Sequence, residues 1–425
     1  MVGEISIDER FARACQLESE GNPDAAQRAY VELLHAEATH FPTLMRLGAL
    51  LATRRQAHAA RTVFAQAVAA HPEEPAGHAA LASLLVDAGE NEAATRAFER
   101  ALELDPGNRD AHRGLAVLAE RAGDQLTAQR HWRAGFPDGR LATTPVRGPG
   151  PHPRVLVVAS ALGGNISLGH VLDPSRFALT TLIAESFSPR THFGTYDTVF
   201  NTIGDADRAR RGLDFAERAL AGTRTRIINP PQRVRHTTRA ENAIRLSALG
   251  GVIAPATIPF PRGTDAAALG LRFPFLVRSP GYQTGLHFLR VDDAAEFAEA
   301  VRTLPGEELL AIAFADTRDS DGAYVKYRAM AIDRVIYPVH RATSSHWKIH
   351  AFSAQREEPE PVLDAATLAR LASIVELLDL DYCGIDFGYD QAGRLVVFEA
   401  NATMIARDPP VIEAVQRMLG TQRTA

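Results

Sequence analysis

The sequence predicts a multidomain chain in which an all-α solenoid of helical repeats precedes an α/β domain and then an α+β domain. Three observations lead to this prediction. Small and aromatic residues recur every 34 positions in the N-terminal third. A stretch rich in proline and glycine follows at residues 137–153. The remainder alternates short apolar runs with helical stretches and ends in a hairpin that carries two carboxylates and an amide.

The repeated unit becomes visible when the chain is aligned with itself at a shift of 34 residues. Small residues then share columns where paired helices would approach each other closely, and aromatic residues share a column that would fill the space between helices. Prolines fall where one unit would end and the next begin. The three clearest columns are Gly48, Ala82 and Ala116; Ala60, Ala94 and Ala128; and Phe64, Phe98 and Trp132.

This pattern resembles the tetratricopeptide repeat, whose helix hairpins stack into a right-handed solenoid. Three repeats cover about residues 41–136, and Ala14, Ala26 and Tyr30 mark a degenerate first unit. We therefore expect residues 1–136 to form one domain with its aromatic column in the core. The resemblance implies a concave face that binds a protein or peptide partner, and nothing in the sequence identifies that partner.

Composition limits the remaining possibilities. The chain has 425 residues, of which 46% are hydrophobic and 23% charged, enough for two or three cores. A net charge of −5 argues against general nucleic-acid binding. No apolar run has membrane-spanning length, and the acidic N-terminus lacks a signal-like apolar segment. The two cysteines, Cys15 and Cys383, predict no disulfide framework and suit a cytoplasmic location.

The C-terminal hairpin contains the candidate metal-binding residues. Two strand-like runs flank a turn at Asp390–Gly393, and alternation along the second strand puts Glu399 and Asn401 on one face. Centring the hairpin on that turn places Asp386 opposite Val397 and diagonal to Glu399. Two carboxylates and an amide oxygen then converge in an apolar setting, and hard oxygen ligands of this kind suit Mg²⁺. The alternative is a hairpin with solvated acids.

Asp386, Glu399 and Asn401 resemble the Mg²⁺-binding acid, acid and amide of the ATP-grasp superfamily. Further matches occur upstream in the expected order and extend the resemblance over about residues 154–405. It implies an α/β pre-ATP-grasp, Rossmann-like domain at 154–258 and an α+β ATP-grasp fold at 259–410, with ATP and Mg²⁺ as cofactors. The upstream matches are residues 154–165, 196–201 and 227–231, then Arg239, then residues 250–257 and 273–285.

The resemblance also assigns phosphate-binding residues. Arg239 and Arg278 stand where the family usually has lysine, so the charge is kept while a planar fork replaces a compact ammonium. Gly281 and Gly285 bound a loop whose backbone would approach the phosphates. Asp319 is the candidate for the acid that holds the ribose. For the loop, the alternative is an ordinary turn between strands, and for Asp319 an exposed turn.

Basic residues follow on two further strand-like runs. The resemblance implies that Arg328, Arg341 and Lys348 face an acyl phosphate and a substrate carboxylate, because phosphoryl transfer depends on positioning and on stabilising oxygen charge. The alternative for each residue is a basic sheet surface. The family's basic residue two positions before the first metal-binding acid is Gly384 here.

The predicted function is an ATP- and Mg²⁺-dependent carboxylate–amine ligase that forms an amide through an acyl phosphate. The repeats would recruit a peptide or protein, and a small carboxylate and an amine would be the substrates. Two alternatives stay open: a catalytically degenerate nucleotide-binding scaffold and an ATP-grasp kinase that stops at phosphoryl transfer. Neither the acyl donor nor the amine acceptor follows from the sequence.

Overall fold

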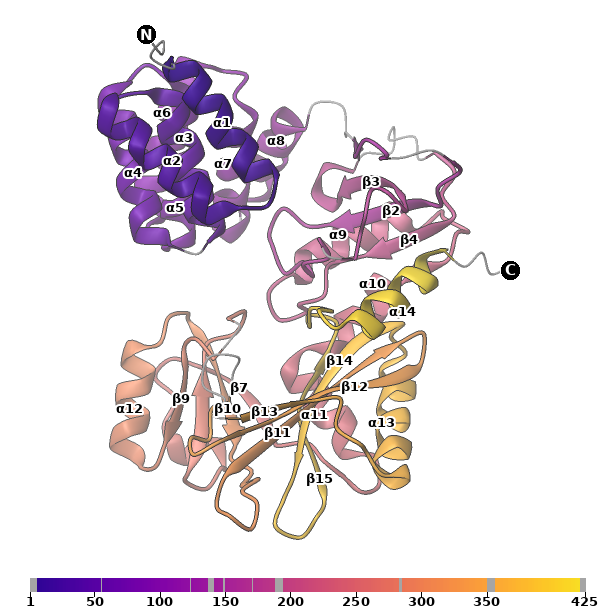
Figure 1. Cartoon of the computed structure of the whole chain (residues 1–425). Coiled ribbons are helices and arrows are strands. Elements are labelled where there is room, and N and C mark those ends of the chain that lie inside the picture. Colours follow the sequence, from indigo (N-terminus) through magenta and orange to yellow (C-terminus); the bar gives the residue numbers. More distant parts are fainter. Residues whose placement is uncertain are drawn as a thin grey trace. The chain divides into compact units, whose positions relative to one another are not determined.

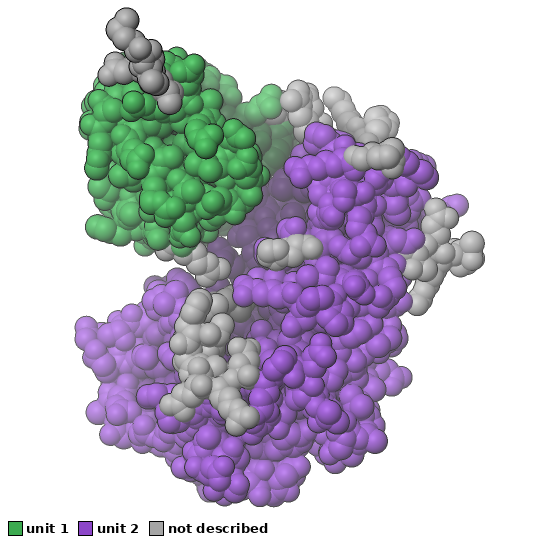
Figure 2. Space-filling model, viewed as in Figure 1, with its two compact units in different colours: residues 1–140 green, residues 141–425 purple. Residues whose placement is uncertain are grey.

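The computed structural model divides into two compact units, Met1–Arg140 and Leu141–Ala425, which are coloured separately in Figure 2. Figure 1 labels their helices and strands. The residues that the structure describes are 6–54, 56–122, 124–136, 141–147, 150–169, 171–187, 194–282, 285–349 and 356–420.

Unit 1 is all α-helical in its described part, and successive helices pack as hairpins: α1 with α2, α3 with α4, α5 with α6 and α7 with α8. Each hairpin also contacts the next one, so the hairpins form a continuous stack (Figure 1). The helices are α1 Ile7–Ser19, α2 Pro23–Ala36, α3 Phe41–Thr53, α4 Ala57–Ala70, α5 Pro75–Asp87, α6 Asn91–Leu104, α7 Arg109–Arg121 and α8 Gln125–Gly135.

Local sequence explains where these helices begin. Ser6 and Glu9 form a reciprocal capping box at the start of α1, and the Asn108 side chain accepts from a backbone N–H at the start of α7. Pro75 occupies the first turn of α5, where no intrahelical donor is needed. Gly89 has a φ of 79° in the turn between α5 and α6, a conformation that favours glycine.

The predicted columns form the core of unit 1. Ala60, Ala94 and Ala128 are completely buried, and Phe98 is buried in the same cluster as Ala94 in the central hairpins. The ring of Phe98 packs so closely on Gly114 of α7 that a side chain at that position would collide with it. The aromatic column is therefore structural, as the sequence predicts, and the degenerate first unit is a helix hairpin as well.

Unit 2 begins with a five-stranded sheet in the order β1-β3-β2-β4-β5. The strands β2 to β5 are parallel, with β1 antiparallel at the edge. β1 belongs to the predicted linker, of which residues 137–140, 148 and 149 lie outside the described residues. The elements are β1 Ala142–Thr143, β2 Arg154–Ala159, β3 Ala178–Ile183, β4 Thr198–Asn201, α9 Arg210–Leu220, β5 Ile227–Ile228 and α10 Pro231–Val234.

A four-stranded antiparallel sheet follows in the order β7-β10-β8-β9, with α12 packed against β8 and β9. Its own small core surrounds Phe275 and Phe297. Figure 1 shows this sheet with α12 as a separate lobe of unit 2. The elements are β7 Thr257–Pro261, β8 Phe275–Arg278, β9 Phe288–Val291, α12 Ala294–Thr303 and β10 Glu308–Ala313.

A six-stranded sheet in the order β13-β12-β11-β14-β15-β6 completes unit 2. One core includes this sheet, α13, α14 and the parallel sheet, so residues from both predicted C-terminal domains are buried together. The elements are α11 Arg239–Ser247, β6 Val252–Ile253, β11 Tyr324–Ile332, β12 Val335–Ser344, β13 Arg356–Pro359, α13 Ala365–Leu378, β14 Tyr382–Tyr389, β15 Leu395–Asn401 and α14 Pro409–Gly420.

The predicted sequence of an all-α repeat domain, an α/β sheet and an α+β region is confirmed. The predicted domain boundaries stay predictions. Within the described ranges, none of the helices combines the length and apolar character that crossing a bilayer requires.

We predict that Phe98→Ala lowers the free energy of unfolding of unit 1 by about 3–5 kcal/mol, because it leaves a cavity between α6 and α7. Urea unfolding should be followed by the fluorescence of Trp132 in a Trp347→Phe background, in which no other tryptophan remains. Leu126→Ala is the control, since this leucine is 83% exposed. A loss of less than 1 kcal/mol, by the same order-of-magnitude scale, would contradict the packing.

A second prediction concerns acid stability. The Nδ1 atoms of His112 and His131 lie 2.9 Å apart, and burial, then His112 and Arg130, lower the pKa of His131. As the pH falls, the imidazole of His131 is therefore protonated in the unfolded chain before it is protonated in the folded chain. The contribution of neutral His131 to the free energy of unfolding is present above the ordinary pKa of about 6.5 and is lost as the pH falls below it. The urea midpoint of unit 1 should drop on acidification, and less so in His131→Gln. Equal drops in both proteins would disprove the role of His131.

Candidate functional site

The β14–β15 hairpin brings the two predicted metal-binding acids closer together than expected. Asp386 lies directly opposite Glu399, and Phe387 lies opposite Val397. The predicted pairing of Asp386 with Val397 is wrong because the connecting turn is one residue longer than expected and the register then shifts at Phe398. Such a bulge places two residues of one strand against one of the other. The two carboxylates consequently share one face of the sheet at a directly opposed position.

Asp386 is held by two cations from the neighbouring strand β11. Arg328 donates from Nε to Oδ1 at 2.7 Å and from Nη2 to Oδ2 at 2.8 Å, and Lys326 Nζ lies 3.3 Å from Oδ2. Lys326 also donates to the carbonyl of Ile349 at 2.9 Å. Burial alone would raise the pKa of Asp386, but Lys326 and Arg328 outweigh it and hold this pKa well below the usual range.

Arg239 makes the corresponding contact with Glu399. It is the first residue of α11, and its Nη2 donates to Glu399 Oε1 at 2.7 Å while its Nη1 donates to Asp207 Oδ2 at 2.5 Å. The Arg239 side chain is only 9% exposed. Burial opposes its charge, but Glu399 and Asp207 more than compensate, so its pKa is raised. Burial raises the pKa of Asp207, with Arg239 acting in the opposite direction.

Asn401 is already engaged on both sides of its amide. Its Nδ2 donates to Glu399 Oε1 at 2.8 Å, and its Oδ1 accepts from the backbone N–H of Thr403 at 2.9 Å and from the Thr403 hydroxyl at 2.7 Å. The amide therefore presents a donor, not an oxygen, to Glu399.

Arg278 differs from these cations because no carboxylate in the described part of the chain pairs with it. It ends β8, is 8% exposed, and donates from Nη2 to the carbonyl of Tyr282. Its Nε is buried without a hydrogen-bond partner among the described residues, and its guanidinium lies 5.1 Å from the ring centre of Phe288. Burial, followed by the charge of Arg239, lowers the pKa of Arg278 to about 10.

Gly281 precedes Tyr282, whose carbonyl accepts from Arg278, and residues 283 and 284 of the predicted loop are outside the described residues. Gly281 has a φ of 76°, and a Cβ there would lie 3.4 Å from the side chain of Arg208. A Cβ on Gly163 would lie 3.1 Å from the Arg208 guanidinium. Arg208 therefore lies next to two glycine-containing loops, one after β2 and one after β8.

Sequence reasoning missed Asp207, Arg208 and Lys326. Asp207 and Arg208 follow β4, and the carboxyl ends of parallel strands are the usual position of ligand-binding residues. That rule could have identified them. Lys326 stands two positions before Arg328 on the same strand, so alternation alone predicts that both side chains lie on one face.

We call the following charged side chains the Asp386 cluster: Asp386, Glu399, Arg239, Arg278, Arg328 and Lys326. Arg341 and Asp319 are not part of the Asp386 cluster. Arg341 of β12 lies opposite Tyr327 of β11 in the strand pairing. The Tyr327 side chain lies on the face of the sheet opposite to that of Arg328 and stacks on Phe387. Arg341 Nε lies 3.2 Å from the Tyr327 hydroxyl, and its Nη2 lies 3.8 Å from Asp319 Oδ2. The other oxygen of Asp319 accepts from two backbone N–H groups of its own turn.

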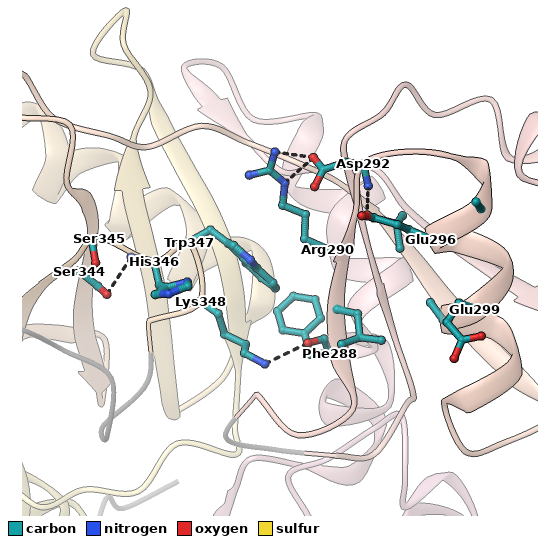
Figure 3. Close-up of a pocket in the computed structure, with 14 residues that line it drawn as sticks. Phe288, Arg290, Asp292, Glu296, Glu299, Ser344, Ser345, His346, Trp347 and Lys348 are labelled. Atoms are coloured by element: carbon teal, nitrogen blue, oxygen red, sulfur yellow. Dashed lines mark hydrogen bonds and ion pairs between the residues drawn. The ribbon is translucent and has the colours of Figure 1, made fainter.

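Lys348 lies at a pocket of about 1020 Å³ between β9, α12 and the segment after β12 (Figure 3). Its Nζ donates to the carbonyls of Gly285 and Phe288 at 3.2 and 3.1 Å. Trp347 and Phe288 meet edge to face in the wall of the pocket, and Glu296 and Glu299 approach from α12. The residue after Lys348, Ile349, is not part of the pocket lining, and its carbonyl accepts from Lys326 at 2.9 Å.

The predicted magnesium ligands have suitable chemistry, but the structure arranges them differently. Both oxygens of Asp386 accept from charged groups, and the oxygen of Asn401 accepts from Thr403. Of the three ligands, only Glu399 keeps an oxygen, Oε2, to which no partner is assigned in the described part of the chain. Across those residues, moreover, no group of three or more His, Cys, Asp or Glu could hold a metal ion. The arrangement does not fit a metal ion bound jointly by all three.

Comparison with known protein families gives a match within unit 1. Residues 75–118 match the family model of the tetratricopeptide repeat. A MamA structure from Desulfovibrio magneticus RS-1 shares 23% identity, with a TM-score of 0.29 over 32% of this chain and 76% of that one. No curated protein sequence matches the chain.

Two ligase structures align with 63% of this chain. The VanG D-Ala:D-Ser ligase from Enterococcus faecalis shares 14% identity with a TM-score of 0.43 over 98% of its length. The D-cycloserine synthetase DcsG shares 16% identity with a TM-score of 0.42 over 99% of its length.

We predict that Arg239→Met destabilises unit 2 by about 3–5 kcal/mol, because it leaves Asp207 and Glu399 partly buried without their cation. Urea unfolding followed by Trp347 fluorescence in a Trp132→Phe background measures this effect. Arg394→Met is the matched control, since Arg394 is 65% exposed and pairs with Asp390. Its effect should stay below about 1 kcal/mol. Equal losses in the two variants would show that burial of the Arg239 pair is unimportant.

Proposed function

We propose that unit 2 binds a nucleoside triphosphate, ATP, with its phosphates against Arg278. The observation that carries this proposal is a buried guanidinium that has no carboxylate partner in the described part of the chain and an Nε donor without an acceptor. A buried charge is costly unless it is paired, and phosphate oxygens accept strong hydrogen bonds from arginine. The glycine-containing loops at Gly163 and Gly281 would let backbone groups approach the same phosphates.

The motifs that resemble the ATP-grasp superfamily extend this proposal to a reaction. A substrate carboxylate oxygen would attack the γ-phosphorus, ADP would leave, and an acyl phosphate would form. An amine nitrogen would then attack the acyl carbon, inorganic phosphate would leave with the electrons of the broken C–O bond, and the nitrogen would lose a proton to give an amide. Arg328 and Lys326 would stabilise negative charge on the phosphoryl oxygens.

The pocket at Lys348 supports two-substrate chemistry, because it combines different kinds of side chain and because Ile349, the residue after Lys348, accepts from Lys326. Trp347 and Phe288 provide apolar surface, Lys348 provides a cation, and Glu296 provides a carboxylate that favours an amine, whereas Glu299 is paired with Arg302. The helical repeats of unit 1 would bring a peptide or protein to this reaction.

A second candidate is a scaffold that binds nucleotide without turnover. The observation that favours it is the pairing of Asp386 with Arg328 and Lys326, which neutralises a carboxylate that the ligases of the superfamily use for Mg²⁺. In that case the repeats would remain the working part of the chain, and ATP would only stabilise unit 2.

Calorimetric titration of ATP into the full chain tests the binding proposal. Arg278→Met should weaken ATP binding about 10- to 100-fold, since a hydrogen bond to a charged group contributes about 1.5–3 kcal/mol. Arg302→Met is the matched control, because Arg302 is 72% exposed on α12 and pairs only with its own helix neighbour Glu299 in the described chain. If the wild-type chain binds no ATP with or without Mg²⁺, the proposal is wrong.

Measuring ADP release and the reaction products with the same protein then distinguishes the three candidate functions. A ligase releases ADP over repeated turnovers only when both a carboxylate and an amine are present, and mass spectrometry detects the amide. A phosphorylated product without an amide would select a kinase, and ATP binding without ADP release would select the scaffold.

A further inference from the structure

We infer that Lys326 and Arg328 take the place of a divalent cation beside Asp386, so that unit 2 binds its triphosphate without a metal ion. This inference rests on the proposed nucleotide site and concerns how that site balances charge. The predicted magnesium ligands Asp386 and Asn401 accept hydrogen bonds from protein groups at the oxygens that a metal ion would need.

The acceptor capacity of Asp386 is largely used by these two side chains. A carboxylate offers about four lone-pair positions, and Arg328 and Lys326 together occupy three of them. The guanidinium binds both oxygens in a bidentate fork, which fixes its direction as well as its distance. The Asp386 side chain is only 7% exposed, so water cannot readily compensate if either cation leaves.

Strand pairing holds the two cations in place. Arg328 lies directly opposite Asp386 in the antiparallel pairing of β11 and β14, and Lys326 lies two residues away on the same face. Lys326 is also fixed by the carbonyl of Ile349 at 2.9 Å. A magnesium ion on Asp386 would have to share the carboxylate with these two cationic side chains or displace one of them.

The net charge at Asp386 with Arg328 and Lys326 bound equals the net charge that a bound Mg²⁺ would give. One Mg²⁺ on one carboxylate leaves a single positive charge, and an arginine and a lysine on one carboxylate leave the same. The polyphosphate would therefore meet a cationic surface of equal net charge, delivered by donors that hydrogen-bond to phosphate oxygens directly. Direct contacts of this kind make the metal unnecessary for binding.

Calorimetry on the full chain tests this with ATP in EDTA and in Mg²⁺. We expect the wild-type affinities to agree within about threefold. Arg328→Met should make binding depend on Mg²⁺ by about tenfold or more, because Asp386 then regains free oxygens. Arg334→Met is the matched control, because Arg334 lies in the turn of the same β11–β12 hairpin, is exposed, and pairs with Asp379 after α13. Wild-type binding that is tenfold weaker in EDTA would overturn the inference.

Two further measurements keep the inference testable if Arg328→Met does not fold or if ATP does not bind. Asp386→Asn should bind ATP in EDTA at least as well as the wild type, whereas a metal site would lose affinity in Mg²⁺. Electron paramagnetic resonance with Mn²⁺ on the nucleotide-free chain should find no ion bound at this position. Mn²⁺ binding that Asp386→Asn abolishes would overturn the inference, independently of whether the nucleotide proposal holds.

Discussion

The buried contact of Arg239 with Asp207 and Glu399 is the interaction on which the rest of the candidate site depends. It joins the loop after β4, the start of α11 and the strand β15, which are far apart in the sequence. One turn further along α11, Asn242 donates to the carbonyl of Ala400 at 2.6 Å. Charges that are largely removed from water are stable only as a set, so this contact helps to hold the loop after β4 against the hairpin.

Charge compensation then divides the basic residues of the cluster into two kinds. Arg239 and Arg328 are paired with carboxylates, whereas Arg278 has no matching acid in the described part of the chain. The lowered pKa of Arg278 has the same cause, because burial and the nearby Arg239 charge both oppose its protonated form. An anionic ligand would relieve both effects at once.

Alternation along β11 separates residues that are neighbours in sequence. Lys326 and Arg328 contact Asp386, whereas Tyr327 lies on the other face with Arg341 and stacks on Phe387. Residues that are equally basic therefore have different surroundings, and only one face of the sheet belongs to the cluster. The Tyr327–Phe387 contact in turn packs this part of the sheet into the core shared with α13.

The sequence by itself determined the features that depend on local spacing. The 34-residue period predicts the helix hairpins because each small residue and its aromatic neighbour belong to adjacent helices. Alternation predicts that Glu399 and Asn401 share a face, and the shared face of Asp386 and Glu399 follows from the hairpin. These relations span few residues, so geometry along the chain is sufficient.

Only the tertiary structure decided which charges meet. The bulge at Phe398 moved Asp386 opposite Glu399, and the pairing of β11 with β14 placed Arg328 on Asp386 across 58 residues of sequence. Arg239 reaches Glu399 across 160 residues. A carboxylate that looks like a metal ligand in the sequence is therefore an ion-pair partner in the fold, because strand register and burial, which no local pattern contains, select its nearest cation.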